Sequence, residues 1–180
     1  MESNQLSLKA SPIHFGTDGW RGVLGVDVTI ERLLAVASAA AQELLYRASP
    51  DNHSREILIG FDRRFLAEEF AEAVAAAVKG CDLEPILSQT ALPTPACSWC
   101  VVKRRALGAL VITASHNPPE WIGLKIKGSF GGSVERDFTK ADILLTTDVG
   151  RLHIAKEKNI FQKIDSPTLN NLVPRNFRDE

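Results

Sequence analysis

A serine in a short polar stretch is the residue of this chain best suited to chemistry. Residues 114–119 read Ala-Ser-His-Asn-Pro-Pro and directly follow the apolar run 107–113. Ser115 can act as a nucleophile only if a neighbouring group accepts its proton or polarises the atom that it attacks. No Gly-x-Ser-x-Gly motif is present, so hydrolase chemistry lacks its sequence signature. Lys125, ten positions on, can return a cation to the loop if the chain between them turns.

A hydroxyl with basic side chains nearby suits a phosphate group better than an acyl group, because phosphate oxygens need their charge neutralised. His116 is adjacent to Ser115 in sequence but need not face the same way. The alternative is that Thr113, Ser115 and Asn117 simply form turns, as such residues usually do. The local pattern leaves both interpretations open.

A glycine-rich segment near the start of the chain is the second candidate. Residues 15–22 read Phe-Gly-Thr-Asp-Gly-Trp-Arg-Gly, with three glycines in seven residues. Such glycines permit unusual backbone angles and the close approach of a ligand. Arg21, beside one of them, could reach an anion with little obstruction. A glycine-rich hairpin with a solvated arginine would explain the same residues equally well.

The three cysteines do not indicate a disulfide framework, because their number is odd and the chain is not small and secreted. Cys97 and Cys100 have C-x-x-C spacing and follow Thr94, a predicted helix cap, and Pro95, which suits the first helical position. A helix N-terminus lowers a thiol pKa and would favour redox chemistry. We favour the simpler interpretation that both thiols pack on one face of a helix.

The chain alternates strand-like and helix-like segments, which is typical of an α/β fold with a mostly parallel sheet and helices on its faces. Thr29 is a predicted N-cap, Gly80 a predicted helix stop, and Pro85 favours the edge of a sheet. In such sheets ligand-binding loops follow the carboxyl ends of strands, which is where Ser115 falls. The predicted elements are a helix over 29–45, a strand over 57–61, a helix over 67–79, a strand over 83–87, a helix from Pro95, a strand over 107–113 and a strand over 122–127.

Composition narrows the class of protein. The 180 residues are 44% hydrophobic and 24% charged, enough for one domain with a core of its own. A net charge of -1 gives no basic field for a nucleic acid, and no run of about 18 apolar residues could span a membrane. The polar N-terminus lacks the apolar core of a signal peptide. We therefore expect a cytoplasmic protein with no nucleic-acid or membrane partner.

Five short motifs, in order, resemble the alpha-D-phosphohexomutase family. The resemblance runs from about Phe15 to Val134, and Trp20 with the stretch 128–132 looks more like phosphoglucomutase/phosphomannomutase than phosphoglucosamine mutase. It implies a three-layer α/β/α domain with a mostly parallel, mixed sheet over 15–148, between a tail over 1–14 and a linker with an incomplete second domain over 149–180. The motifs are 15–22, Gly-Phe-Asp-Arg-Arg at 60–64, Leu-Pro-Thr-Pro at 92–95, 113–119 and Gly-Leu-Lys-Ile-Lys at 123–127.

The resemblance also implies roles for individual residues. Ser115 would carry the transferable phosphoryl group, with hexose phosphate and hexose bisphosphate as the partners of the reaction. His116 and Lys125 would assist proton transfer and hold phosphate oxygens, with Lys125 the stronger general acid/base candidate. Arg21 would neutralise charge around the phosphoserine. We expect the Arg21 and Lys125 side chains to converge on Ser115.

Two further residues and a metal complete the implied site. Asn117 and Asp62 would support the loop, and Mg²⁺ would be bound in part by an oxygen of the phosphate on Ser115. The family's Asn before the turn glycine is Ile122 here, ahead of Gly123, which removes a polar turn former near Lys125.

The sequence departs from the family in what it lacks. The Asp-Gly-Asp-Gly-Asp-Arg metal loop, the sugar-selecting loop and the C-terminal phosphate loop are not among these residues. We therefore expect an incomplete phosphohexomutase that is inactive alone, binds Mg²⁺ weakly and could pair with a complementing mutase fragment. The alternative is a non-catalytic binding module derived from a mutase.

Overall fold

The computed structural model describes residues 10–16 and 18–134. In this part of the chain, no helix is long and apolar enough to cross a membrane. The predicted domain bounds fall partly outside the described residues and stay predictions. The elements are β1 (Trp20–Val23), α1 (Ile30–Tyr46), β2 (Glu56–Phe61), α2 (Ala67–Gly80), β3 (Glu84–Leu87), α3 (Thr94–Arg104), β4 (Gly108–Ile112) and β5 (Trp121–Gly128).

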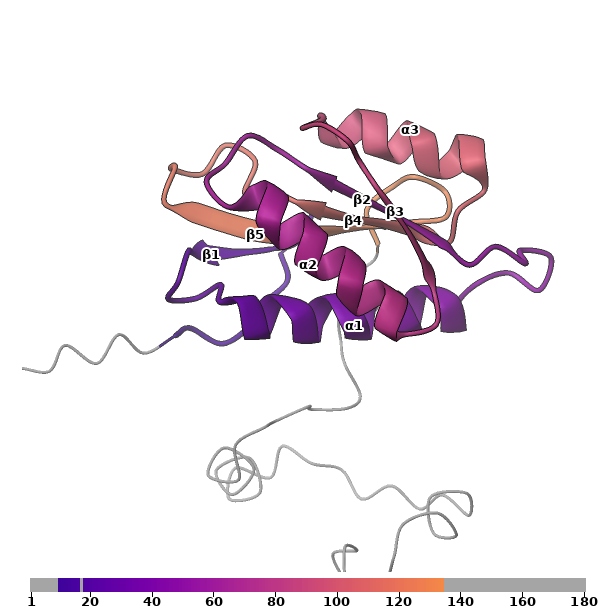
Figure 1. Ribbon diagram of the computed structural model, residues 1–180, viewed down its shortest axis with the longest axis horizontal. Helices are drawn as coiled ribbons and strands as arrows, with labels where there is room; N and C mark the ends of the chain where they lie inside the picture. The colour runs from indigo at the N-terminus through magenta and orange to yellow at the C-terminus, as the bar shows by residue number, and fades with distance from the viewer. Residues whose placement is uncertain (1–9, 17, 135–180) are drawn as a thin grey trace, which may run out of the picture. The chain divides into compact units, whose positions relative to one another are not determined.

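The strands form one mixed sheet in the order β1-β5-β4-β2-β3. β2 pairs in parallel with both β3 and β4, whereas β5 is antiparallel to β4 and to β1. α1 and α2 lie on one face of the sheet and α3 on the other (Figure 1). This arrangement confirms the predicted α/β fold with three layers and a mixed sheet.

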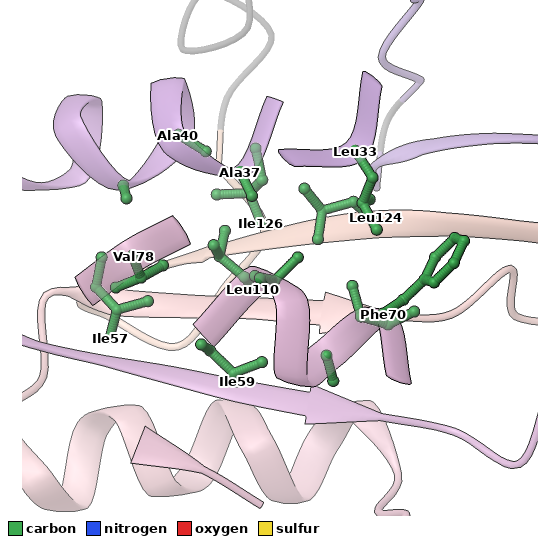
Figure 2. Packing of buried hydrophobic residues seen from close by; sticks show 14 of the residues in the cluster. Leu33, Ala37, Ala40, Ile57, Ile59, Phe70, Val78, Leu110, Leu124 and Ile126 are labelled. Atoms are coloured by element: carbon green, nitrogen blue, oxygen red, sulfur yellow. The ribbon is translucent and has the colours of Figure 1, made fainter. Parts of the chain in front are cut away.

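The alternation of side chains along the central strands explains both layers of core. On β4, Leu110 and Ile112 belong to the large core beneath α1 and α2, while Ala109 and Val111 belong to a smaller core beneath α3. A strand buried on both faces reads as a continuous apolar run, which is why β4 was visible in the sequence. Figure 2 shows Leu110 among apolar residues of the helices and of the neighbouring strands.

Some predicted element boundaries are confirmed and others are wrong. The Thr29 hydroxyl accepts a hydrogen bond from the backbone N of Arg32 at 3.4 Å, so Thr29 caps α1 as expected. Gly80 ends α2 without a left-handed angle; Asp82, two residues later, takes φ 58° instead. Thr94 is the first residue of α3 and makes no capping bond, because Pro93 already holds the extended conformation that precedes the helix.

The edges of the sheet gave one confirmation and one correction, and the neighbouring strand β5 gave another correction. β3, which contains Pro85, is an edge strand as predicted. β1 is the opposite edge and was missed, because its four residues carry glycine and too little alternation to indicate a strand. Ile122 is no turn residue: it lies inside β5, opposite Gly22, with 1% of its surface exposed. An apolar side chain at this position therefore packs in the core.

Candidate active site

Ser115 lies in the loop that follows the carboxyl end of β4, as predicted. Its side chain is exposed and its backbone takes the left-handed angle φ 57°. The Ser115 N–H donates to the hydroxyl of Thr113 at 2.9 Å, and the Asn117 N–H donates to the carbonyl of Ala114 at 3.1 Å. A left-handed angle at a non-glycine residue is costly and persists only where the surroundings determine it. These local bonds are one part of that support.

The larger part comes from Arg64, which the sequence analysis did not single out. Its Nη2 donates to the carbonyl oxygens of Ser115 at 2.8 Å and Asn117 at 2.7 Å. Its Nη1 donates to the carbonyl oxygens of Pro118 at 2.7 Å and Trp121 at 3.0 Å. The only signal in the sequence was its place at the end of the motif 60–64.

Asp62, predicted as a support, connects the end of β2 to the serine loop. One of its oxygens accepts a hydrogen bond from the Thr113 hydroxyl at 2.6 Å, and the other accepts from the backbone N of Arg64 at 3.0 Å. The backbone of Asp62 also donates to the carbonyl of Ile112 at 3.1 Å. Asp62 and Arg64 thus join two neighbouring parallel strands at the edge where the serine loop begins.

Arg21 reaches the same loop from β1. Its Nη1 donates to the side-chain oxygen of Asn117 at 3.1 Å, across 96 positions of sequence. On β5 the partner of Arg21 is Gly123, where an added Cβ would lie 2.1 Å from the Trp20 carbonyl oxygen and 3.1 Å from Cγ of Arg21. The glycine therefore lets the arginine side chain lie close against β5 on its way to the loop.

Lys125 is paired within the domain, and its predicted convergence on Ser115 stays a prediction. Its ammonium is paired with Asp18, its side chain is 8% exposed, and no hydrogen bond joins it to Ser115 within the described residues. Gly19 gives this lysine room, because an added Cβ there would lie 3.1 Å from Cα and Cγ of Lys125. The ion pair joins Asp18 of the motif 15–22 to Lys125 of the motif 123–127. The sequence analysis treated these motifs separately and did not predict this contact.

Asp18 is the centre of a small charged network that the sequence did not reveal. Its second oxygen accepts from Lys127 Nζ at 2.8 Å and from the Ser133 hydroxyl at 2.5 Å, and Lys127 also donates to Ser133 at 2.8 Å. Burial by itself raises the pKa of Asp18, but the hydrogen bonds from Lys125, Lys127 and Ser133 outweigh it and hold that pKa well below its ordinary value. The carboxylate is therefore ionised whenever the domain is folded near neutral pH.

The exposed side of the site is an open hollow of about 480 Å³ beside Ser115. His116 is exposed and makes no hydrogen bond within the described residues, so its ring is available to a ligand. Of the predicted site residues, the structure joins Ser115, Asn117, Asp62 and Arg21 through direct contacts or through Arg64. The hollow is lined by Asp62, Arg63, Arg64, Phe65, Ser115, Asn117 and Pro119.

The cysteine pair has the character of packing rather than of redox chemistry. Cys97 is 3% exposed and belongs to the small core between α3 and the sheet. Burial, together with the neighbouring Cys100, raises the pKa of the Cys97 thiol to about 11. A thiol with such a pKa is protonated at neutral pH, which favours the packing interpretation.

The residues present do not form a magnesium site by themselves. No group of three or more His, Cys, Asp or Glu side chains in the described ranges could hold a metal ion. Asp62, the carboxylate that is bonded to the start of the serine loop, already accepts hydrogen bonds from Thr113 and from the backbone of Arg64. Basic side chains otherwise dominate the loop, and they favour an anion over a cation.

The fold and the site together define a class of protein. It is an α/β/α domain with an exposed serine in a cation-rich loop that follows a central strand. The family model of the phosphoglucomutase/phosphomannomutase α/β/α domain I matches residues 12–145. The chain therefore belongs to the phosphoglucomutase/phosphomannomutase family, of which it carries domain I.

Individual relatives agree with this family. A phosphoglucosamine mutase of Saccharopolyspora erythraea is 40% identical over 117 residues, which are 65% of this chain and 26% of the relative. A phosphoglucosamine mutase of Prochlorococcus marinus is 34% identical over 144 residues, 80% of this chain and 30% of the relative. A Thermus thermophilus protein described as a phosphomannomutase has 37% identity and a TM-score of 0.66, covering 73% of this chain and 29% of that structure.

The relatives show how much of a whole mutase this chain matches and whether its sugar can be assigned. The chain spans between a quarter and a third of the length of each of these three relatives. Both curated relatives are phosphoglucosamine mutases, so the expected preference for the phosphoglucomutase/phosphomannomutase type receives no support from them. The structure relative is of the phosphomannomutase type. The comparisons thus identify the family and leave the sugar open.

Proposed function

We propose that this chain is the phosphoserine domain of a phosphohexomutase, with Ser115 as the group that accepts and donates the phosphoryl group. The observation that carries the proposal is the exposed Ser115 hydroxyl in a loop contacted by two arginines, Arg21 and Arg64. Phosphoryl transfer gains mostly from positioning and from charge neutralisation, and the loop offers both.

The reaction would be two reciprocal transfers. The hydroxyl oxygen of a hexose phosphate attacks the phosphorus on Ser115, the bond from phosphorus to the serine oxygen breaks, and a hexose bisphosphate forms. The serine oxygen then attacks the phosphorus of the sugar's other phosphate, the bond from that phosphorus to the sugar oxygen breaks, and a hexose monophosphate leaves. Each attacking hydroxyl must lose its proton, for which His116 is our candidate acceptor. Each departing oxygen must gain one, for which the ammonium of Lys125 is our candidate donor.

The contacts of Arg21, Lys125 and His116 support a different role for each. Arg21 uses one N–H on Asn117 and has others left for phosphate oxygens within the described part of the chain. Lys125 is held by Asp18, so it would serve from a fixed position, whereas His116 is exposed and unbonded there. For Mg²⁺, the oxygen of a phosphate on Ser115 would be the main ligand that these residues offer.

We further propose that these 180 residues alone turn over hexose phosphate negligibly. The stretches that match the two curated relatives cover 26% and 30% of those proteins, and the hollow beside Ser115 is open among the described residues. The bound sugar would therefore be neither desolvated nor clamped at its second phosphate.

Transfer of a single phosphoryl group to Ser115 tests the proposal. Purified chain is incubated for hours with a hexose 1,6-bisphosphate, and its intact mass and fragment masses are recorded. We expect a mass gain of one phosphoryl group that maps to Ser115, because one slow transfer needs no turnover. Ser115→Ala should abolish the gain, and Ser129→Ala, which changes another exposed serine, should not.

Three results would contradict the proposal. Phosphorylation of another residue, or an equal gain in Ser115→Ala, would contradict the assignment of Ser115. No gain in the wild-type chain, with its fold intact, would support the alternative of a non-catalytic binding module.

A further inference from the structure

The guanidinium of Arg64 donates most of its hydrogen bonds to backbone carbonyls of the serine loop. It has five N–H groups, and four of them donate to the carbonyl oxygens of Ser115, Asn117, Pro118 and Trp121. The fifth, on Nε, lies 3.3 Å from a carboxylate oxygen of Asp62, an ion pair that does not reach hydrogen-bond geometry. The Arg64 side chain is only 12% exposed.

The loop needs such a partner because of its own sequence. Pro118 and Pro119 have no N–H, so they cannot donate backbone hydrogen bonds, and Ser115 holds a left-handed angle. Carbonyl oxygens turned toward one another in a tight loop also repel unless a cation lies among them. One planar guanidinium satisfies four of them at once, which an ammonium on a flexible stem cannot do.

Arg21 provides the contrast on the other side of the loop. It makes one hydrogen bond, to the Asn117 side chain, and its remaining N–H groups have no partner within residues 10–16 and 18–134. Arg64 therefore has no accessible N–H left for a phosphate oxygen, because four donate to carbonyls and the unbonded Nε–H is buried, whereas Arg21 has several. The two arginines contact the same loop but cannot have the same task.

We infer that Arg64 is a positioning residue, which fixes the Ser115 backbone for phosphoryl transfer through the loop carbonyls and does not itself bind the phosphate. The inference rests on the proposed function in that it assigns the serine loop to phosphoryl transfer. Asp62 orients Arg64 and is bonded to Thr113, so the three residues hold the loop onto the ends of β2 and β4.

The first test measures the loop itself and needs no phosphoryl donor. Amide hydrogen exchange of Ser115 and Asn117 is followed by NMR in the wild-type chain and in Arg64→Lys. We expect exchange at both amides to become at least about tenfold faster in the variant, because several carbonyl bonds are lost while the charge is kept. Arg55→Lys is the matched control: Arg55 also donates to a backbone carbonyl, that of Asp82, but far from the loop. It should leave both amides unchanged.

The second test separates positioning from phosphate binding in the unmodified protein. Inorganic phosphate is added to the wild-type chain while the Nε–H signals of its arginines are observed. We expect the Arg21 signal to shift with phosphate and the Arg64 signal to stay. A shift of Arg64 as large as that of Arg21 would overturn the inference. This measurement decides the matter even if Arg64→Lys does not fold.

The third test links the loop to the chemistry. In Arg64→Lys, the rate of Ser115 phosphorylation at saturating hexose bisphosphate should fall at least about tenfold, with the half-saturating donor concentration little changed. A rise in that concentration with an unchanged maximal rate would show that Arg64 binds phosphate, against the inference. If the wild-type chain accepts no phosphoryl group, the proposed function fails, while the exchange and phosphate measurements still decide the role of Arg64 in the loop.

Discussion

Charges around the serine loop are arranged so that some are neutralised within the domain and others are left for a ligand. Lys125 and Lys127 share the carboxylate of Asp18, and Arg64 is occupied by carbonyl oxygens and Asp62. Arg21 has unused N–H groups within the described residues. At the scale of single residues, Arg21 therefore has donors left for an anion, and the exposed Arg63 adds a further cation at the hollow.

Binding of inorganic phosphate should follow this distribution. We expect phosphate to shift the NMR signals of His116 and Asn117 more than those of His53, which lies before β2, at the opposite end of the parallel strands. Binding should be weak, because the hollow is open to solvent. Arg21→Ala should remove most of the response.

The control for that experiment is Arg104→Ala. Arg104 is an equally charged residue that pairs with Glu56 at the start of β2, away from the serine loop. Its replacement should leave the phosphate response intact. Equal shifts at His116 and His53, or a response that survives in Arg21→Ala, would show that no anion site exists there. His153, a further possible reference, lies outside the described residues.

The Asp18 network should contribute to stability in a pH-dependent way. Because the folded-state pKa of Asp18 lies below its ordinary value of 3.8, the unfolded chain binds more protons in acid, and the contribution is lost as pH falls below that value. At neutral pH, Asp18→Asn should lower the free energy of unfolding by about 2 to 3 kcal/mol, since two nearly buried ammonium groups lose their counter-ion. Urea unfolding of both proteins from neutral pH to about pH 3 measures the difference.

The difference between the two proteins should shrink toward the acid end of that range. Asp51→Asn, at an exposed carboxylate outside the network, should change little at any pH. A difference that stays constant down to the acid end would argue that Asp18 contributes through its shape and not through its charge.

At the scale of elements, the contact between β1 and β5 decides where the cations lie. The two strands meet where Gly19 and Gly123 provide no side chain, and Arg21 and Lys125 fill the space. The antiparallel register sets Arg21 opposite Gly123, on the strand that also carries Lys125. Because Gly19 and Gly123 have no side chain, Lys125 and Arg21 can pack closely against the backbone.

Gly123→Ala tests this contact. An added Cβ would lie 2.1 Å from the Trp20 carbonyl oxygen, which is backbone and cannot move aside cheaply. We expect a loss of about 2 to 4 kcal/mol in the free energy of unfolding, as for other substitutions that overpack a core. Equilibrium urea unfolding gives the value, and the phosphate response of His116 should weaken because Arg21 is displaced with β1.

Gly80→Ala is the matched control on α2. No atom lies within 4 Å of an added Cβ there, and the residue has no left-handed angle. Alanine should therefore be tolerated, with a gain in stability of at most about 0.5 kcal/mol, because Gly80 is the last residue of the helix. If Gly123→Ala were as harmless as this control, β1 could not be held against β5 as closely as the structure has it.

At the scale of the whole molecule, the domain that carries the site corresponds to part of the length of its relatives. The chain spans 26% of the Saccharopolyspora mutase and 29% of the Thermus structure, and its serine loop opens onto a hollow on the surface of the domain. Positioning of a sugar with two phosphate groups requires contacts at both ends of it. Under the proposed function, the described residues would contact one end.

Turnover by the chain alone should accordingly be negligible. A coupled assay of glucose 1-phosphate to glucose 6-phosphate, with Mg²⁺ and a bisphosphate primer, should give no rate above that of Ser115→Ala. An intact mutase of the same family serves as the positive control for the assay. Robust turnover that is abolished in Ser115→Ala would contradict this prediction and would mean that the residues of this chain suffice.

Periodicity and motif order in the sequence were enough to predict the layers and the place of Ser115. A buried strand such as β4 is a continuous apolar run, a helix such as α1 repeats at its own period, and both signals are local. The loop after β4 could then be located by topology alone. Glycine-rich β1 carried no such signal and was missed.

Only the tertiary structure decided which charges meet. Asp18 binds Lys125 across 107 positions, Arg21 reaches Asn117 across 96, and Arg64 reaches Ser115 across 51. Such contacts depend on strand register and on the space that glycines leave, and the local sequence pattern predicts neither. The sequence therefore indicated that cations surround a serine, whereas the fold determined that Arg64 holds the loop, Asp18 holds Lys125 and Arg21 has donors left for an anion.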